Sequence, residues 1–153
     1  MSRRGSVRSG AVDSSPVVHS SGAVEPNAAA APATAVGSHL LADLHGIAPG
    51  LLRDAVVLER VLRAAADGAG AHVLASHFHS FGADEGVTGV VLLAESHISI
   101  HTWPEYGFAA ADVFMCGASQ PDRALAVLIT ALAPERQDIR SLARGEVSSR
   151  STR

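Results

Sequence analysis

One short stretch, Glu95–Gly117, gathers side chains that suit chemistry at a reacting centre. It contains a glutamate–serine junction, two histidines and the only tryptophan, tyrosine and cysteine of the chain. A serine hydroxyl is a nucleophile, an imidazole exchanges protons near neutral pH, and a thiol does so near a pKa of about 8.5. The stretch is therefore the first candidate for an active site.

The junction between Glu95 and Ser96 can undergo a specific rearrangement. The serine hydroxyl attacks the carbonyl before it, and an ester replaces the peptide bond. Removal of the serine Cα proton expels the upstream chain, and hydrolysis of the resulting dehydroalanine leaves a pyruvoyl group and ammonia. These steps need a strained or well-placed peptide bond, an oxyanion donor and a base. A glutamate–serine pair is common, so alone it indicates only a serine at a strand edge.

Residues Glu95–Glu105 read ESHISIHTWPE. This segment resembles the processing site of the small prokaryotic S-adenosylmethionine decarboxylase proenzymes, and the resemblance covers roughly residues 37–146. It implies cleavage between Glu95 and Ser96 and a covalent pyruvoyl cofactor made from Ser96, which holds the substrate as a Schiff base. It also implies that S-adenosylmethionine is converted to CO2 and decarboxylated S-adenosylmethionine, the aminopropyl donor for spermidine, by a homodimer of cleaved protomers.

The same resemblance assigns roles to three residues around the junction. His101 matches the base that takes the serine Cα proton, and Cys116 matches the acid that protonates the substrate carbon after CO2 leaves. Thr88 stands where the family has a hydroxyl residue that helps processing. Taken without the resemblance, His101 and His97 are structural histidines that bond backbone carbonyls, Cys116 is a small core residue, and Thr88 is a β-branched strand residue.

Three further residues match a nucleoside-binding site in the same family. Glu105 corresponds to a carboxylate that accepts both ribose hydroxyls, Phe81 to an aromatic ring stacked on adenine, and Trp103 offers a second planar ring. As alternatives, Glu105 is a solvated turn acid and the two rings belong to the core. The loop Gly82–Glu85 departs from the family pattern, because it is one residue longer, lacks a proline and carries two acids.

Two alternatives keep the same fold. The first is a pyruvoyl-dependent ornithine or arginine decarboxylase, in which Asp84 or Glu85 would receive the distal cation of the substrate. The second is an uncleaved, non-enzymatic paralogue that acts as a partner subunit. The intact set of Ser96, His101 and Cys116 argues against the second alternative.

A metal-dependent hydrolase is a third alternative, of a different class. His77 and His79 lie two residues apart, as do His97 and Ser99, with His101 two further on. Histidines at such spacings on strands can share a metal ion. No well-placed pair of acids accompanies them, so we expect no metal.

Composition sets the broad class. The chain has 153 residues and a net charge of −3, without a stripe of Lys and Arg, which predicts one domain that does not bind nucleic acid. A single cysteine excludes an internal disulfide, and no apolar run reaches the roughly 20 residues of a membrane helix. Arg3-Arg4 precedes a polar segment rather than an apolar signal core, so we expect a cytoplasmic protein.

The elements that position these residues follow from apolar periodicity. Apolar runs and alternation predict strands at His39–Leu44, Ala71–Phe81, Val87–Ala94, Ser96–Thr102, Phe108–Cys116 and Asp138–Arg144. The almost wholly apolar run 87–94 predicts an interior strand covered on both faces. Trp103-Pro104 should end its strand, and 138–144 should be an edge strand. Helical stripes run from Leu51 to about Gly68, and from Pro121 to Pro134.

This order predicts an α+β fold, a two-layer α/β sandwich in which helices cover one face of a mostly antiparallel sheet. Residues 1–36 are rich in Ser, Gly, Ala and Pro and predict a disordered N-terminal tail. Residues 37–146 form the predicted pyruvoyl-dependent decarboxylase domain, and 147–153 form a flexible C-terminal tail.

Overall fold

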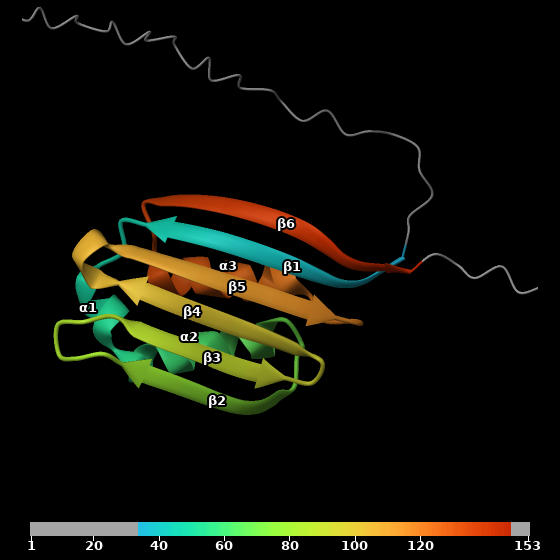
Figure 1. The fold of residues 1–153 in the computed structure, drawn as a ribbon, viewed down its shortest axis with the longest axis horizontal. Helices are drawn as coiled ribbons and strands as arrows, with labels where there is room; N and C mark the ends of the chain where they lie inside the picture. Colours follow the sequence, from blue (N-terminus) through green and yellow to red (C-terminus); the bar gives the residue numbers. More distant parts are fainter. Residues whose placement is uncertain (1–33, 148–153) are drawn as a thin grey trace, which may run out of the picture. The chain divides into compact units, whose positions relative to one another are not determined.

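A computed structural model of the chain describes residues 34–147 and places six strands in one sheet (Figure 1). The strands are β1 (Thr34–His45), β2 (Val73–Ser80), β3 (Val87–Leu93), β4 (Ser96–Trp103), β5 (Phe108–Cys116) and β6 (Arg136–Val147). Their order is β2-β3-β4-β5-β1-β6, and every neighbouring pair is antiparallel. The predicted α+β architecture is confirmed.

The helices cover one face of this sheet. They are α1 (Pro49–Arg53), α2 (Ala55–Gly68) and α3 (Pro121–Leu132), with a short 3-10 turn, η1 (Pro104–Tyr106). Helix α2 packs on β2, β3 and β4, and α3 packs on β1 and β5, so the two lie side by side behind the sheet (Figure 1). No helix in this described range is long and apolar enough to cross a membrane.

The single helix expected from Leu51 to Gly68 is instead two helices. Asp54 interrupts it with an extended backbone, at φ −91° and ψ 93°. Its carboxylate accepts the N–H groups of Val56 and Val57, at 3.0 and 2.9 Å, and so caps α2. An aspartate satisfies the free donors at a helix start better than it serves inside a helix, which explains the break.

Side-chain alternation on β4 and β5 separates the two faces of the sheet as predicted. Ile98 and Ile100 of β4 are fully buried against the helices. His97, Ser99 and His101 project from the other side, which we call the open face. The open face has no helix on it in the described part of the chain (Figure 1).

Strand β3 is interior but is not covered on both faces, contrary to the expectation for residues 87–94. Val87, Val91 and Leu93 are buried under α2, whereas Leu92 on the open face is 48% exposed. The apolar run thus predicted the position of the strand in the sheet correctly and its surroundings incorrectly. An apolar run on a face that no helix covers marks a surface suited to a further partner.

The two ends of the described chain pair with each other. Strand β1 begins at Thr34, ahead of the start expected at His39, and β6 extends to Val147, past the expected end at Arg144. Thr34 and Val147 are partners in the β1–β6 ladder, so each end extends the other. Strand β6 is an edge strand, as predicted. The rest of both predicted tails, 1–33 and 148–153, lies outside the described residues.

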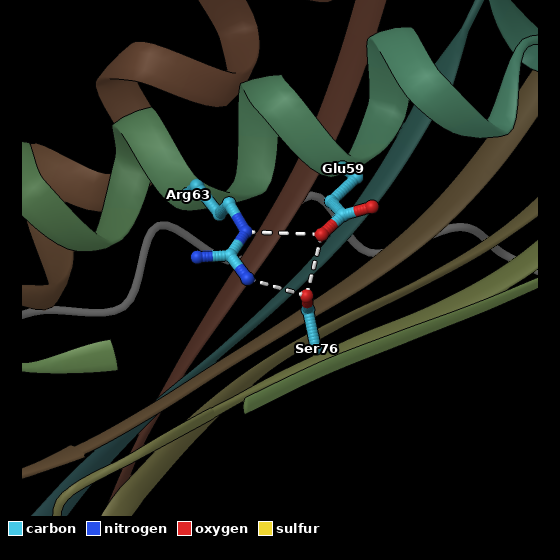
Figure 2. Close-up of polar contacts among 3 residues, drawn as sticks. All are labelled: Glu59, Arg63 and Ser76. Atoms are coloured by element: carbon cyan, nitrogen blue, oxygen red, sulfur yellow. Dashed lines mark hydrogen bonds and ion pairs between the residues drawn. The ribbon is translucent and has the colours of Figure 1, made fainter. Parts of the chain in front are cut away.

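A polar contact fixes the edge strand β2 under α2. Arg63 donates from Nε to Glu59 at 3.0 Å and from its terminal nitrogen to Ser76 Oγ at 2.7 Å, while the Ser76 hydroxyl donates to Glu59 (Figure 2). These donors, Ser76 foremost, lower the pKa of the Glu59 carboxyl below its usual value. The contact holds the strand that leads into Phe81.

Candidate active site

Ser96 follows a two-residue turn, Ala94-Glu95, that joins β3 to β4. Ser96 pairs with Leu93 across this hairpin. Glu95 has a left-handed backbone, with φ of 63°, a conformation that costs a non-glycine residue roughly 1–2 kcal/mol. The peptide bond expected to be cut is therefore held directly after a strained residue.

Cys116, at the end of β5, lies beside Ser96. The backbone N–H of Cys116 donates to Ser96 Oγ at 3.1 Å. Its thiol is half-buried and free, and it packs against the backbone of Gly37 on β1. A backbone donor aimed at the serine oxygen fixes the hydroxyl and stabilises negative charge that develops on it. This end of β4 thus brings together Glu95, Ser96 and Cys116.

Thr88 and His101 form a second pair, on β3 and β4. They face each other in the ladder, and Thr88 Oγ1 lies 2.9 Å from His101 Nδ1. Both side chains are on the open face. This contact fixes the orientation of the imidazole ring. A strand histidine without such a partner would lack a fixed orientation.

A cavity of about 320 Å³ surrounds this second pair. Its lining residues are Phe81, Glu85, Gly86, Thr88, His101, Thr102, Trp103 and Glu105. The four residues predicted to support processing or bind substrate all line this cavity: Thr88, Phe81, Trp103 and Glu105. The predicted base, His101, lines it too. The volume lies at the small end of the range for ligand sites.

Both predicted aromatic residues expose their rings to this cavity rather than entering the core. Trp103 is 38% exposed and stacks on Phe108, with ring centroids 5.2 Å apart. Phe81 is 61% exposed and meets His79 edge to face at 4.8 Å. A ring supported on one face and open on the other can stack on a planar ligand.

The start of β3 and the end of β4 meet beneath the cavity at Thr102. This buried hydroxyl accepts the N–H of Val87 at 2.7 Å and donates to the Leu52 carbonyl at 2.7 Å. A side chain at Gly86 would collide with the Thr102 carbonyl, so glycine lets the preceding loop approach β4. Neither residue was predicted from the sequence, although a threonine on the buried face of an alternating strand is a signal for such a bond.

The structure does not bring all predicted catalytic residues together within one copy. Ser96 and Cys116 lie at one end of β4 and β5, whereas His101 lies near the other end of β4. Five residues of extended strand separate Ser96 from His101, a distance of about 16 Å. In a single copy, His101 is therefore too far from Ser96 to take its Cα proton.

Polar and aromatic residues occupy the open face between the two ends. His97 stacks on Phe114, with ring centroids 5.7 Å apart. Ser99 donates to Asp112 at 3.0 Å, and the same carboxylate lies 3.7 Å from His39 Nε2. Asp112 and His39 were not predicted as site residues, because their only signal in the sequence is their place among alternating strand residues.

The predicted histidines on β2 do not form a metal centre with those on β4. Within residues 34–147, no three His, Cys, Asp or Glu side chains are grouped so that they could hold a metal ion. Strand β3 lies between His77 and His79 on one side and His97 on the other. A larger cavity, of about 460 Å³, lies near Gly37 and Gly117 and is lined by none of the predicted site residues.

Comparison with known proteins identifies the family. Residues 38–145 match the family model described as S-adenosylmethionine decarboxylase. The chain is 43% identical over 117 residues to the S-adenosylmethionine decarboxylase proenzyme of Thermodesulfovibrio yellowstonii, covering 76% of this chain and 86% of that protein. It is 48% identical over 110 residues to the proenzyme of Parasynechococcus marenigrum, covering 71% and 85%.

The fold agrees with this assignment. The crystal structure of the adenosylmethionine decarboxylase from Aquifex aeolicus aligns with a TM-score of 0.73 at 41% identity. The alignment covers 78% of this chain and 98% of that one. These matches confirm the resemblance carried by ESHISIHTWPE, and the chain belongs to the S-adenosylmethionine decarboxylase family.

Proposed function

We propose that this protein is a self-processing, pyruvoyl-dependent decarboxylase of S-adenosylmethionine. Its relatives are named S-adenosylmethionine decarboxylase proenzymes, a name that implies activation by a cut. The observation that carries the proposal is the position of Ser96. It directly follows left-handed Glu95, and its hydroxyl oxygen accepts the N–H of Cys116.

Processing begins at the Glu95–Ser96 bond. Ser96 Oγ adds to the Glu95 carbonyl carbon, the C–N bond breaks, and the serine nitrogen leaves as a free amine with an ester in its place. Loss of the Ser96 Cα proton to a base expels the Glu95 carboxylate and leaves dehydroalanine. Hydrolysis then yields ammonia and a pyruvoyl group, which heads a chain of residues 96–153, separate from residues 1–95.

The residues around Ser96 fit a pyruvoyl group. Ser96 is half-buried at a strand end, and the backbone N–H of Cys116 donates to its hydroxyl oxygen, so a small planar group there would have this donor beside its own oxygen. When present, a pyruvoyl group supplies a carbonyl that captures the substrate amine and accepts the electrons left behind by CO2. Cys116 would then hold the proton for the substrate carbon.

We further propose that the active site is shared between two copies. About five residues of extended strand, or about 16 Å, separate Ser96 from His101, so the two side chains cannot reach each other within one copy. A two-fold arrangement of facing sheets would bring Ser96 and Cys116 of one copy to the Thr88–His101 cavity of the other. Exposed Leu92 and Leu142 on the open face support this arrangement, because a second sheet would cover them.

His101 has the contact that a base needs. If Nδ1 carries the hydrogen, it can donate to Thr88 Oγ1, 2.9 Å away, and Nε2 then keeps a free lone pair. Such a lone pair can accept the Cα proton of the facing copy's residue 96. Thr88 thereby acts as the residue that orients the base.

The cavity residues divide the recognition of the nucleoside among them. Glu105 offers two carboxylate oxygens to the two ribose hydroxyls, and Phe81 and Trp103 offer partly exposed rings to adenine. Free ornithine or arginine would use none of these three features. The cavity therefore favours S-adenosylmethionine over the two amino acids.

The primary experiment follows cleavage and decarboxylation of the purified protein. Denaturing electrophoresis should separate two chains, and mass spectrometry should find the smaller one beginning at residue 96 without its serine amine. CO2 release from labelled S-adenosylmethionine should exceed release from ornithine and arginine. A folded protein that stays one chain would overturn the self-processing proposal, and a preference for ornithine or arginine would overturn the substrate.

A mixed-copy experiment tests the shared site. Alone, Ser96→Ala has no nucleophile, and His101→Ala should stall at the ester, which hydroxylamine would release as two chains. Mixed dimers of these two variants contain one site with both Ser96 and His101, provided that the site is shared. Differently tagged variants, expressed together, should therefore cleave the His101→Ala chain. Absence of this cleavage in confirmed mixed dimers would place each site within one copy.

A further inference from the structure

The loop between β2 and β3 carries two adjacent acids that differ in their surroundings. Backbone bonds close the loop: Phe81 N–H donates to the Gly86 carbonyl at 3.1 Å, and Glu85 N–H donates to the Gly82 carbonyl at 3.3 Å. The turn therefore has a defined shape. This shape sets the direction of each acidic side chain.

Asp84 is directed to helix α1. Its carboxylate lies 3.4 Å from a terminal nitrogen of Arg53, and the residue does not line the cavity. Glu85 does line the cavity, beside Thr88, Trp103 and Glu105. Among the described residues, no side chain forms an ion pair or hydrogen bond with the Glu85 carboxylate.

The cavity consequently has an excess of negative charge. Glu85 and Glu105 line it, and His101 is the only lining residue that can carry a positive charge, because no Lys or Arg is among them. One carboxylate suffices for a ribose diol. The second is left to interact with a positively charged part of the ligand.

We infer that Glu85 recognises the sulfonium charge of the substrate. This inference rests on the function proposed above. S-adenosylmethionine carries a permanent positive charge on the sulfur bonded to the ribose C5′, so a carboxylate in the cavity that binds the ribose lies close to that charge. A sulfonium has no N–H or O–H to donate, and it is therefore recognised through charge rather than through directed hydrogen bonds.

Recognition of this kind selects for the sulfonium over neutral thioether nucleosides. Two probes isolate the effect: 5′-methylthioadenosine, which is neutral, and 5′-dimethylthioadenosine, which differs by one methyl group and carries the sulfonium charge. Neither probe has the α-carboxylate or the aliphatic α-amine through which the substrate would react at residue 96. Their affinities therefore measure the nucleoside and sulfur parts of the site alone.

The test measures binding of both probes to the processed protein by calorimetry, with wild type, Glu85→Gln and Asp84→Asn. Glu85→Gln should lower the affinity for the sulfonium probe about fivefold, which is the effect of one charge at contact distance in a hydrated site. The same change should leave the affinity for the thioether probe unchanged. Asp84→Asn removes an equal charge from the same loop but should change neither affinity. Added salt should reduce the ratio of the two affinities, sulfonium over thioether, and this reduction should be larger for wild type than for Glu85→Gln.

Other outcomes overturn the inference in distinguishable ways. If wild type binds both probes and Glu85→Gln has no effect, or weakens both equally, Glu85 does not recognise the sulfonium, while the proposed substrate stands. An equal effect of Asp84→Asn would show that the loop acts only through its overall charge. If wild type binds neither probe, the nucleoside substrate itself is wrong, and the role of Glu85 falls with it.

Discussion

The two ends of β4 are built by different means. At the Ser96 end, backbone features position the serine: a tight turn, a left-handed residue and the N–H of Cys116. At the His101 end, side chains and a loop line a cavity. A side-chain substitution can thus change the shape or charge of the cavity, whereas the position of Ser96 changes only if the backbone of the strands moves. The comparison predicts that the cleaved bond and its nucleophile depend on the Ser96 end, whereas substrate choice depends on the cavity end, which also holds the proposed base His101.

Ser96→Ala should have the largest effect, because it removes both the nucleophile and the source of the cofactor. We expect a single uncut chain by denaturing electrophoresis and no detectable CO2 release. Ser99→Ala is the matched control on the same strand, where the hydroxyl bonds Asp112 instead. Cleavage of Ser96→Ala at its usual site would show that another residue attacks the chain.

Cys116→Ala should separate processing from turnover at the same end of β4. The group that contacts Ser96 Oγ is the backbone N–H, which alanine retains, so the chain should still be cut. Loss of the acid should slow decarboxylation by about 10²–10⁴-fold. Mass spectrometry should also detect gradual transamination of residue 96, caused by protonation at the wrong carbon. Full and lasting activity of Cys116→Ala would show that Cys116 only packs in the structure and is not the proton donor.

Glu105→Gln should affect only the cavity end. The amide keeps one acceptor oxygen but loses the charge, which should cost about 1.5–3 kcal/mol of substrate binding. We expect KM to rise and cleavage at Ser96 to continue at its normal rate. A defect in cleavage as large as the defect in KM would show that the two ends do not act separately.

Glu95→Gly should have the smallest effect, through the left-handed turn. Glycine adopts φ of 63° without strain. When Glu95→Gly is added to the uncut Ser96→Ala variant, the free energy of unfolding should therefore rise by about 0.5–1 kcal/mol. With Ser96 intact, the same change should slow processing. Ala133, at φ 46°, is the matched control: Ala133→Gly should stabilise similarly without changing processing. Equal processing rates for both variants would show that strain at Glu95 is not used.

Periodicity predicted the fold where one element decided its own structure. The alternation in β4, the break at Pro104 and the start of α3 at Pro121 were all correct. The break at Asp54 was missed, because apolar spacing continues across it while a local cap decides the geometry. The length of β1 was also missed, since residues 34–37 extend only because β6 pairs with them.

The motif predicted the site residues but not how they are distributed. The structure places Thr88, Phe81, Trp103 and Glu105 around one cavity, which their separation in sequence did not require. The spacing of Ser96 and His101 on a strand already implied about 16 Å between them, which is too far for the two side chains to meet within one copy. The contribution of Glu85 needed the loop geometry, because sequence alone treats Asp84 and Glu85 alike.

The position of β1 gives the proposed cut an unusual outcome. Residues 1–95 would contain β1, β2 and β3, and residues 96–153 would contain β4, β5 and β6. Strand β1 lies between β5 and β6, and β3 pairs with β4, so three ladders would join the two pieces. The pieces would stay interleaved after the cut, but refolding them would become a bimolecular encounter. The mature protein should therefore regain its structure from denaturant at a rate that depends on concentration, whereas each uncut chain can assemble this sheet alone.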